Sequence, residues 1–195
     1  MYSFFMHDDS YSNQGYEHML DFQMSWILRV AASKERSQNN FILYKRCFDV
    51  LMKLIEKSPN DKVEVISVNV WKQWKRIDVL ANVMIKCNDK EERHLIVIEN
   101  KAYTKIHNDQ LNRYEKIINK EYGNDNFQRD FIKHFWVITL SGLNESGEYD
   151  NNYWILKSMC DSAYADWKLL SFDDVMDDDT PTGSEHFDDF WIYNW

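Results

Sequence analysis

The stretch IDVLANVMIKCNDKEERHLIVIENK, residues 77–101, carries two strand patterns separated by a turn. Between Ile77 and Ile85 an apolar residue occupies every second position, which predicts a strand with one apolar face. The turn is predicted at Asn88-Asp89-Lys90. The run Leu95–Glu99 is apolar up to its last residue, which is typical of a strand buried on both faces. The stretch therefore predicts two strands of a covered sheet.

The segments on either side predict the other elements. Apolar residues at helical spacing indicate two opening helices, and the turn Ser58-Pro59-Asn60-Asp61 ends the second of them. The helical positions are Met19, Phe22, Trp26 and Val30, then Phe41, Tyr44, Phe48, Met52 and Ile55. Further strands are expected over Val63–Val70, Phe135–Leu140 and Trp167–Phe172, and further helices over about 105–121 and about 151–165. The order α-α-β-β-β-α-β-α-β predicts an α/β fold of three layers, α/β/α, around a mixed central sheet.

The composition fits a globular protein with its own core. Of 195 residues, 44% are hydrophobic and 28% are charged, which argues against a disordered chain. Five glycines and two prolines are too few for a turn-rich β-sandwich. We expect no membrane span, no signal peptide and no membrane partner. The widely spaced Cys47, Cys87 and Cys160 are expected to be core residues, and a cytoplasmic location is the default.

Negative charge is concentrated at the end of the sequence. The net charge is −9, yet residues 171–195 hold eight acidic residues and no Lys or Arg, so the preceding residues are close to neutral. A neutral body leaves room for a local basic groove. We divide the chain into a domain over 1–176 and an acidic, aromatic tail over 177–195. The tail is expected to dock its aromatic side chains on the body with its acids in solvent. The alternatives are a nucleic-acid mimic and a segment that binds a protein partner.

Two acidic positions stand out in the strands of residues 77–101. Asp78 lies within a strand, where Asp is disfavoured, and Glu99 points to the same side as Lys101, because strand side chains alternate. Each position alone is explained as well by a solvated strand end. If the strands pair, Asp78, Glu99 and the backbone carbonyl of Asn100 meet at one edge of the sheet. Two carboxylates and a carbonyl form an oxygen site that suits Mg²⁺.

Asp78, followed after twenty residues by Glu99-Asn100-Lys101, resembles the PD-(D/E)XK nuclease superfamily, which has the restriction-endonuclease-like fold. The resemblance implies that Asp78 and Glu99 hold Mg²⁺ or Mn²⁺ and that Lys101 assists the attacking water. The residue before Asp78 is Ile77 rather than Pro, a variation that the superfamily tolerates.

Further positions match the same superfamily. Gln110 and Tyr114 share a helical face, and they are similar to the QxxxY motif of RecB-type members, which implies that they orient the catalytic groups. An ordinary packing position fits them equally well. Glu17, in the first turn of the first predicted helix, best matches a family glutamate that completes the metal shell. It also fits an acid that the helix dipole favours.

The densest basic region brackets the Asp78 and Glu99 strands. Its candidates for phosphate contacts are Lys72, Lys75, Arg76, Lys105 and Arg113. Trp71, Trp74 and Tyr103 are candidates for stacking on bases of a single strand. Solvated helix faces and core aromatics explain each residue singly just as well.

The combined pattern predicts a metal-dependent nuclease that hydrolyses phosphodiester bonds, with DNA favoured as substrate. A role in defence, restriction or repair rests on analogy with the fold. Two alternatives stay open: an RNA-directed nuclease, and a non-catalytic module of the same fold that binds a protein partner. The sequence leaves open whether the protein forms a homodimer.

Overall fold

A computed structural model describes residues 13–58, 60–107, 109–123, 131–144, 146–176 and 179–193. The elements follow in the order α1 (Asn13–Val30), α2 (Lys34–Asn39), α3 (Phe41–Leu54), β1 (Val63–Trp74), β2 (Ile77–Cys87), β3 (Lys90–Lys101), α4 (Gln110–Tyr122), β4 (Phe131–Thr139), α5 (Asn151–Ala163), β5 (Trp167–Ser171), α6 (Phe172–Val175) and α7 (Glu185–Trp191).

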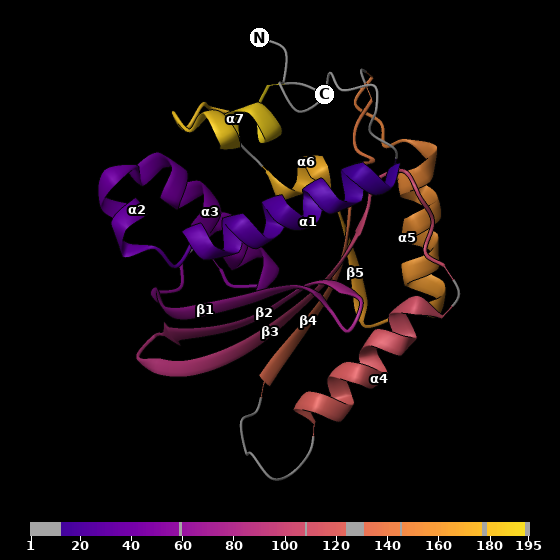
Figure 1. Ribbon diagram of the computed structural model, residues 1–195, viewed down its shortest axis with the longest axis horizontal. Helices are drawn as coiled ribbons and strands as arrows, with labels where there is room; N and C mark the ends of the chain where they lie inside the picture. The colour runs from indigo at the N-terminus through magenta and orange to yellow at the C-terminus, as the bar shows by residue number, and fades with distance from the viewer. Residues whose placement is uncertain are drawn as a thin grey trace.

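The five strands form one mixed sheet in the order β1-β2-β3-β4-β5. The first three strands pair antiparallel through two hairpins, whereas β3, β4 and β5 run parallel. Parallel neighbours need crossover connections, and these are supplied by the segments that contain α4 and α5. Figure 1 shows α1, α3, α6 and α7 on one side of the sheet and α4 and α5 on the other. The three-layer α/β/α fold predicted from the sequence is therefore confirmed.

Each face of the sheet has its own apolar core. The larger core packs α1, α3 and α7 against alternate strand positions such as Val79 and Ile98. The second core packs α4 and α5 against the intervening positions, such as Leu80 and Val97. All residues of β3 from His94 to Lys101 are buried. The prediction of a strand covered on both faces is thus confirmed, and it explains why polar side chains on β3 are also buried.

Several details differ from the predicted elements. The helix expected from about residue 105 begins at Gln110, because Asp109 directly before it has a left-handed φ of 45°. Hydrogen bonds from the Ala102 N–H and the Thr104 hydroxyl to Glu17 hold the segment before residue 105. Ile77 packs in the second core with Leu80, although alternation placed it with Val79. It directly follows the β1–β2 turn, where the backbone leaves the regular strand conformation. The short helices α2 and α6 were not predicted.

The segment after residue 176 contributes to the larger core. Phe187, Phe190 and Trp191 of α7 are buried there, as expected for docked aromatic side chains. The expectation that the acids are solvated is wrong for Asp188, which is 3% exposed and accepts hydrogen bonds from Thr182 and Gly183. The division at residue 176 stays a prediction, with the core extending across it.

The three cysteines are buried and free, as predicted. Within the described ranges, none of the helices combines the length and the apolar character needed to cross a membrane.

Candidate active site

The predicted site residues meet in a pocket where β2 begins and β3 ends. Val79 pairs with Ile98 in the β2–β3 hairpin, so Asp78 and Glu99 lie one position farther toward the same end. The pocket has a volume of about 300 Å³. It is lined by Glu17, His18, Asp21, Gln73, Arg76, Asp78, Glu99, Lys101, Gln110, Arg113 and Tyr114. The fold therefore brings together all five predicted catalytic side chains and Glu17.

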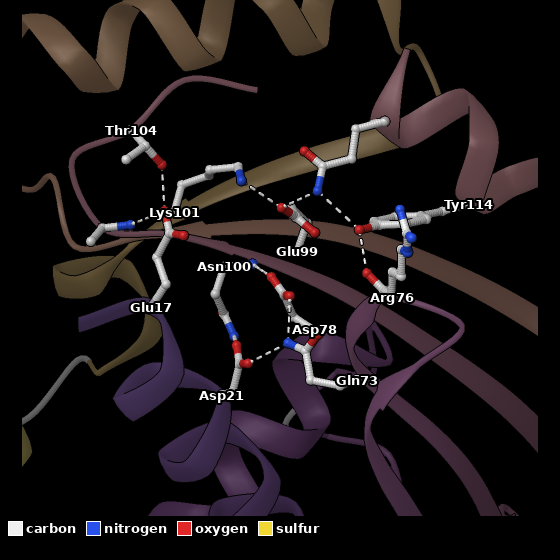
Figure 2. Close-up of polar contacts among 12 residues, drawn as sticks. Glu17, Asp21, Gln73, Arg76, Asp78, Glu99, Asn100, Lys101, Thr104 and Tyr114 are labelled. Carbon is white, nitrogen blue, oxygen red and sulfur yellow. Dashed lines mark hydrogen bonds and ion pairs between the residues drawn. The ribbon is translucent and has the colours of Figure 1, made fainter. Parts of the chain in front are cut away.

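Asp78 accepts hydrogen bonds on both carboxylate oxygens. The backbone N–H of Asn100 donates to Oδ2 at 2.8 Å, and Gln73 Nε2 donates to Oδ1 at 2.9 Å. The first bond crosses from β2 to β3, beyond the last regular pair of the hairpin. It fixes the Asp78 carboxylate beside the peptide that joins Glu99 to Asn100 (Figure 2).

Glu99 and Lys101 form a buried ion pair. Lys101 Nζ lies 2.5 Å from Glu99 Oε1, and the two side chains are 5% and 2% exposed. Figure 2 shows them pointing toward each other above the end of β3. The other carboxylate oxygen, Oε2, is buried and has no hydrogen-bond partner among the residues that the structure describes. Buried carboxylate oxygens are normally paired, so this one can bind a further cation.

Gln110 and Tyr114 of α4 hold Glu99 from the opposite side. Gln110 Nε2 donates to Glu99 Oε1 at 2.7 Å and to the Tyr114 hydroxyl oxygen at 2.9 Å. The Tyr114 hydroxyl in turn donates to the backbone carbonyl of Arg76 in the β1–β2 turn. This chain of hydrogen bonds connects α4, β3 and the β1–β2 turn around one carboxylate. The location of this hydrogen-bond chain fits the expectation that Gln110 and Tyr114 orient the catalytic groups.

Glu17 lines the pocket from α1. It lies in the second turn of the helix rather than the first, because α1 begins at Asn13. Its Oε1 accepts from the Ala102 N–H at 3.3 Å and from the Thr104 hydroxyl. Glu17 therefore ties α1 to the loop after Lys101, and the helix-dipole explanation does not apply to it, since that effect falls off beyond the first turn.

Sequence reasoning missed Asp21 and Gln73. Asp21 is 3% exposed and accepts from Asn100 Nδ2 at 2.7 Å and from Gln73 Nε2 at 2.8 Å. It follows Glu17 by four residues, so both acids lie on one face of α1, and that spacing was the signal that could have revealed it. Gln73 has no comparable signal, because its position depends on an unusual backbone conformation.

The predicted nucleic-acid contacts divide into two groups. Arg76 and Arg113 line the pocket, and the Arg113 guanidinium lies over the Tyr114 ring, 5.2 Å from its centroid. The other three lie outside it: Lys72 stands over Phe22, Lys75 pairs with Glu121, and Lys105 is exposed on the loop before α4.

Among the aromatic candidates, Trp71 and Tyr103 are 42% and 48% exposed. Trp74 packs against the second core. The packing of Trp74 favours a place in the core over stacking on bases, whereas Trp71 and Tyr103 retain exposed ring surface.

The pocket holds four acids, Glu17, Asp21, Asp78 and Glu99, near the Lys101 ammonium group. Burial is the largest cause that raises the pKa of Asp78 well above its ordinary value, and the charges of Glu99 and Asp21 add to it. Burial likewise raises the pKa values of Glu99 and Asp21. For Lys101 burial acts to lower the pKa, but the Glu99 charge and hydrogen bond outweigh it and the pKa is raised. The carboxylates repel one another, so the pocket favours added positive charge.

The oxygen atoms of the pocket fit a divalent cation that takes part of its ligands from the protein and the rest from water. In the part of the chain that the structure describes, no three Asp, Glu, His or Cys residues form a complete metal-binding cluster. Mg²⁺ needs fewer protein ligands, because it keeps several waters and binds through one or two carboxylates. Asp78 and the unpartnered Oε2 of Glu99 supply two carboxylates in a pocket with room for water. The residues present therefore fit such an ion.

Comparison with known proteins identifies a family. A family model described as the PD-(D/E)XK nuclease superfamily matches residues 1–187. No curated protein and no solved structure matches the chain.

Proposed function

Since the chain belongs to the PD-(D/E)XK nuclease superfamily, we propose that it is a metal-dependent nuclease that hydrolyses phosphodiester bonds in DNA. The observation that carries this proposal is the state of Glu99. Its Oε1 is held by Lys101 and Gln110, while its buried Oε2 makes no hydrogen bond within the described ranges. DNA is proposed as the substrate by analogy with the fold.

Asp78, Glu99 and the backbone carbonyl of Asn100 are the proposed ligands of Mg²⁺ or Mn²⁺, with Glu17 completing the shell. Such an ion would supply Lewis-acid activation of water and of the phosphate. Asp78 is oriented for this task by the Asn100 N–H, and Glu99 by Gln110, which Tyr114 steadies. Both carboxylates thus have a neighbour that restricts their rotation, and that restriction keeps the site ready for the reaction.

Lys101 is the proposed partner of the attacking water. Its side chain is 5% exposed, its ammonium group lies beside Glu99, and its raised pKa keeps it charged at neutral pH. A fixed cation here offsets the negative charge that develops on the phosphate during attack. Arg76 and Arg113 line the same pocket and are the proposed contacts for neighbouring phosphates.

A cleavage assay tests the proposal. Circular and linear duplex DNA, single-stranded DNA and RNA are each incubated with the protein and Mg²⁺ or Mn²⁺, and parallel samples contain excess chelator. We expect metal-dependent cutting of at least one DNA substrate. In Lys101→Ala the rate should fall by about 10²–10³-fold, because a preorganised charge is lost.

Lys157→Ala is the matched control, since Lys157 is a surface lysine of α5 that pairs with Asp161. Its rate should equal that of the wild type. If the protein cuts only RNA, the proposed DNA substrate is wrong and the protein is an RNA-directed nuclease. If neither metal supports cutting of any substrate, the nuclease proposal fails and the non-catalytic interaction module is favoured.

A further inference from the structure

Gln73 of β1 joins the buried Asp21 and the half-buried Asp78 through one amide group. Its Nε2 donates to Asp21 Oδ2 at 2.8 Å and to Asp78 Oδ1 at 2.9 Å. A side-chain amide nitrogen has two hydrogens, so both are used in these contacts. Figure 2 shows Gln73 between the two carboxylates, which come from α1 and β2. Each acid thus receives a hydrogen bond that partly offsets the repulsion from the other.

The backbone at Gln73 departs from the strand conformation beside the β1–β2 turn, where Lys75 and Arg76 are left-handed as well. Its φ is 55°, although the regular pairs Lys72–Val79 and Trp74–Ile77 flank it in the hairpin. A residue with a Cβ atom is disfavoured in this left-handed region. Gln73 is exposed to solvent, so the burial of apolar surface does not explain its backbone conformation. Such strain often persists at sites where function depends on it.

The contacts of Gln73 extend to the peptide beside Glu99. Asp21 also accepts from Asn100 Nδ2 at 2.7 Å, and Asp78 accepts from the Asn100 N–H at 2.8 Å. Gln73, Asp21, Asn100 and Asp78 therefore form a closed ring of hydrogen bonds that spans α1, β1, β2 and β3. In this ring Gln73 is the only member from β1, and it fixes the rotation of the Asp78 carboxylate.

From this ring we infer that Gln73 is a positioning residue for metal binding, which holds Asp78 in the orientation needed to bind a divalent cation and does not touch the cation itself. The inference rests on the proposed function, since it takes Asp78 as a ligand. Outer partners of ligating carboxylates alter metal affinity by about 10–100-fold when they are removed.

Two variants distinguish this positioning role of Gln73 from a purely structural role. Gln73→Gly removes the amide and suits the left-handed backbone. Gln73→Met keeps the length of the side chain and removes both donors. Mn²⁺ binding is measured without nucleic acid, by calorimetry and by the loss of the free Mn²⁺ electron paramagnetic resonance signal. We expect the Kd for Mn²⁺ to rise about 10–100-fold in both variants, with the far-ultraviolet circular dichroism unchanged.

Asp89→Gly is the matched control. Asp89 has a φ of 68° in the β2–β3 turn, so the substitution removes the same kind of backbone strain far from the pocket. Its Mn²⁺ affinity should equal that of the wild type. A further readout is rescue: cleavage by Gln73→Met should recover as Mn²⁺ is raised, because the ligands themselves remain.

The outcomes distinguish the inference from the proposed function. If the wild type binds Mn²⁺ and both Gln73 variants bind it with the same Kd, the inference is overturned and the nuclease proposal stands. An equal loss in Asp89→Gly would overturn it as well, because the effect would then come from hairpin flexibility. If the wild type binds no Mn²⁺, both proposals fail together.

Discussion

Strand β3 carries a buried ionisable cluster at each end, and the two clusters are built differently. At the Glu99 end, the charges of Glu99, Glu17 and Asp78 act on Lys101. Three polar atoms there are buried with no hydrogen-bond partner among the described residues: Glu99 Oε2, Asn100 Oδ1 and Gln110 Oε1. At the other end, His94 and His134 are stacked at 5.2 Å between ring centroids, with a hydrogen bond of 3.0 Å between them.

Every ring nitrogen at the histidine end has a partner. His94 Nε2 lies 3.0 Å from Glu92, and His134 Nδ1 lies 3.1 Å from Glu56. Lys57 and Lys168 pair with those two glutamates, so the acids are balanced by bases. A satisfied network rigidifies the fold, whereas unsatisfied polar atoms are costly. The comparison therefore supports placing the proposed metal site at the open cluster and a structural network at the closed cluster, although both lie on the same strand.

The largest difference between the two ends should appear in catalysis. Glu99→Gln keeps the shape of the side chain and removes a proposed metal ligand, so we expect the rate of Mg²⁺-dependent DNA cleavage to fall by more than about 100-fold, beyond the effect of an outer partner. His94→Gln, on the same strand, should keep the wild-type rate per folded molecule. Equal losses of rate in the two variants would remove the distinction between the clusters.

The second difference should appear in stability. His134→Leu leaves His94 Nδ1 without its partner in a buried position, so the free energy of unfolding should fall by about 2–4 kcal/mol. Urea denaturation measures it. Lys168→Ala removes an exposed ion pair from the same network and should cost at most about 1 kcal/mol. A His134→Leu protein as stable as the wild type would contradict the structural interpretation of this end.

Acidification should act on the two ends with opposite sign. Burial and the His134 charge lower the pKa of His94 to about 4 from 6.5, so the unfolded chain binds its proton first and stability is lost as the pH falls through this window. The shift corresponds to about 3 kcal/mol. The raised pKa of Glu99 works the other way, because the folded state takes up its proton first and stability is gained on acidification.

Unfolding experiments from pH 6.5 to pH 4 measure these two contributions. Relative to the wild type, His94→Gln should lose less stability over this range, because the unfavourable protonation is gone. Glu99→Gln should lose more, because the favourable protonation is gone. Shifts of the same sign in both variants would show that the pKa directions assigned to the two ends are wrong.

The smallest expected effect concerns substrate binding at the rim of the Glu99 end. If Arg113 contacts a phosphate, Arg113→Ala should weaken DNA binding a few-fold and reduce the slope of log Kd against log salt by about 1. Binding is measured in Ca²⁺ by fluorescence anisotropy. Lys168→Ala, at the histidine end, removes the same charge and should leave the slope unchanged. A reduced slope in the Lys168 variant alone would place the nucleic acid at the histidine end of β3 and contradict the proposed site.

The sequence predicts the Asp78 and Glu99 pair because their meeting depends on a local hairpin. Asp78 lies ten positions before Asn88 and Glu99 ten positions after Asp89, so a two-residue turn aligns them. The alternation of apolar residues and the buried strand also come from short stretches. By contrast, the contact of His94 with His134 depends on the register of two parallel strands joined through α4, which no local pattern specifies.

The part of the site that escaped prediction depends on backbone strain and distance. Gln73 reaches Asp21, 52 residues away, only with a left-handed φ that no local preference of glutamine favours. The loop before α4 was predicted as helix because Ile106 continues the apolar spacing, whereas the hydrogen bonds of Glu17 hold the preceding residues outside the helix. Both errors lie beside the candidate site, where contacts between distant segments override local preference.

The burial of α7 also makes the core under α1 depend on a segment that is synthesised after the whole sheet. Phe187 and Phe190 have no exposed surface, and they fill a core whose other walls come from α1 and from β2. The β1–β2–β3 hairpins can form early from contacts close in the chain. The core beneath α1 cannot close until residue 190 has left the ribosome. The pocket formed by α1, β2 and β3 is therefore completed only after α7, which follows all three in the chain, has been synthesised.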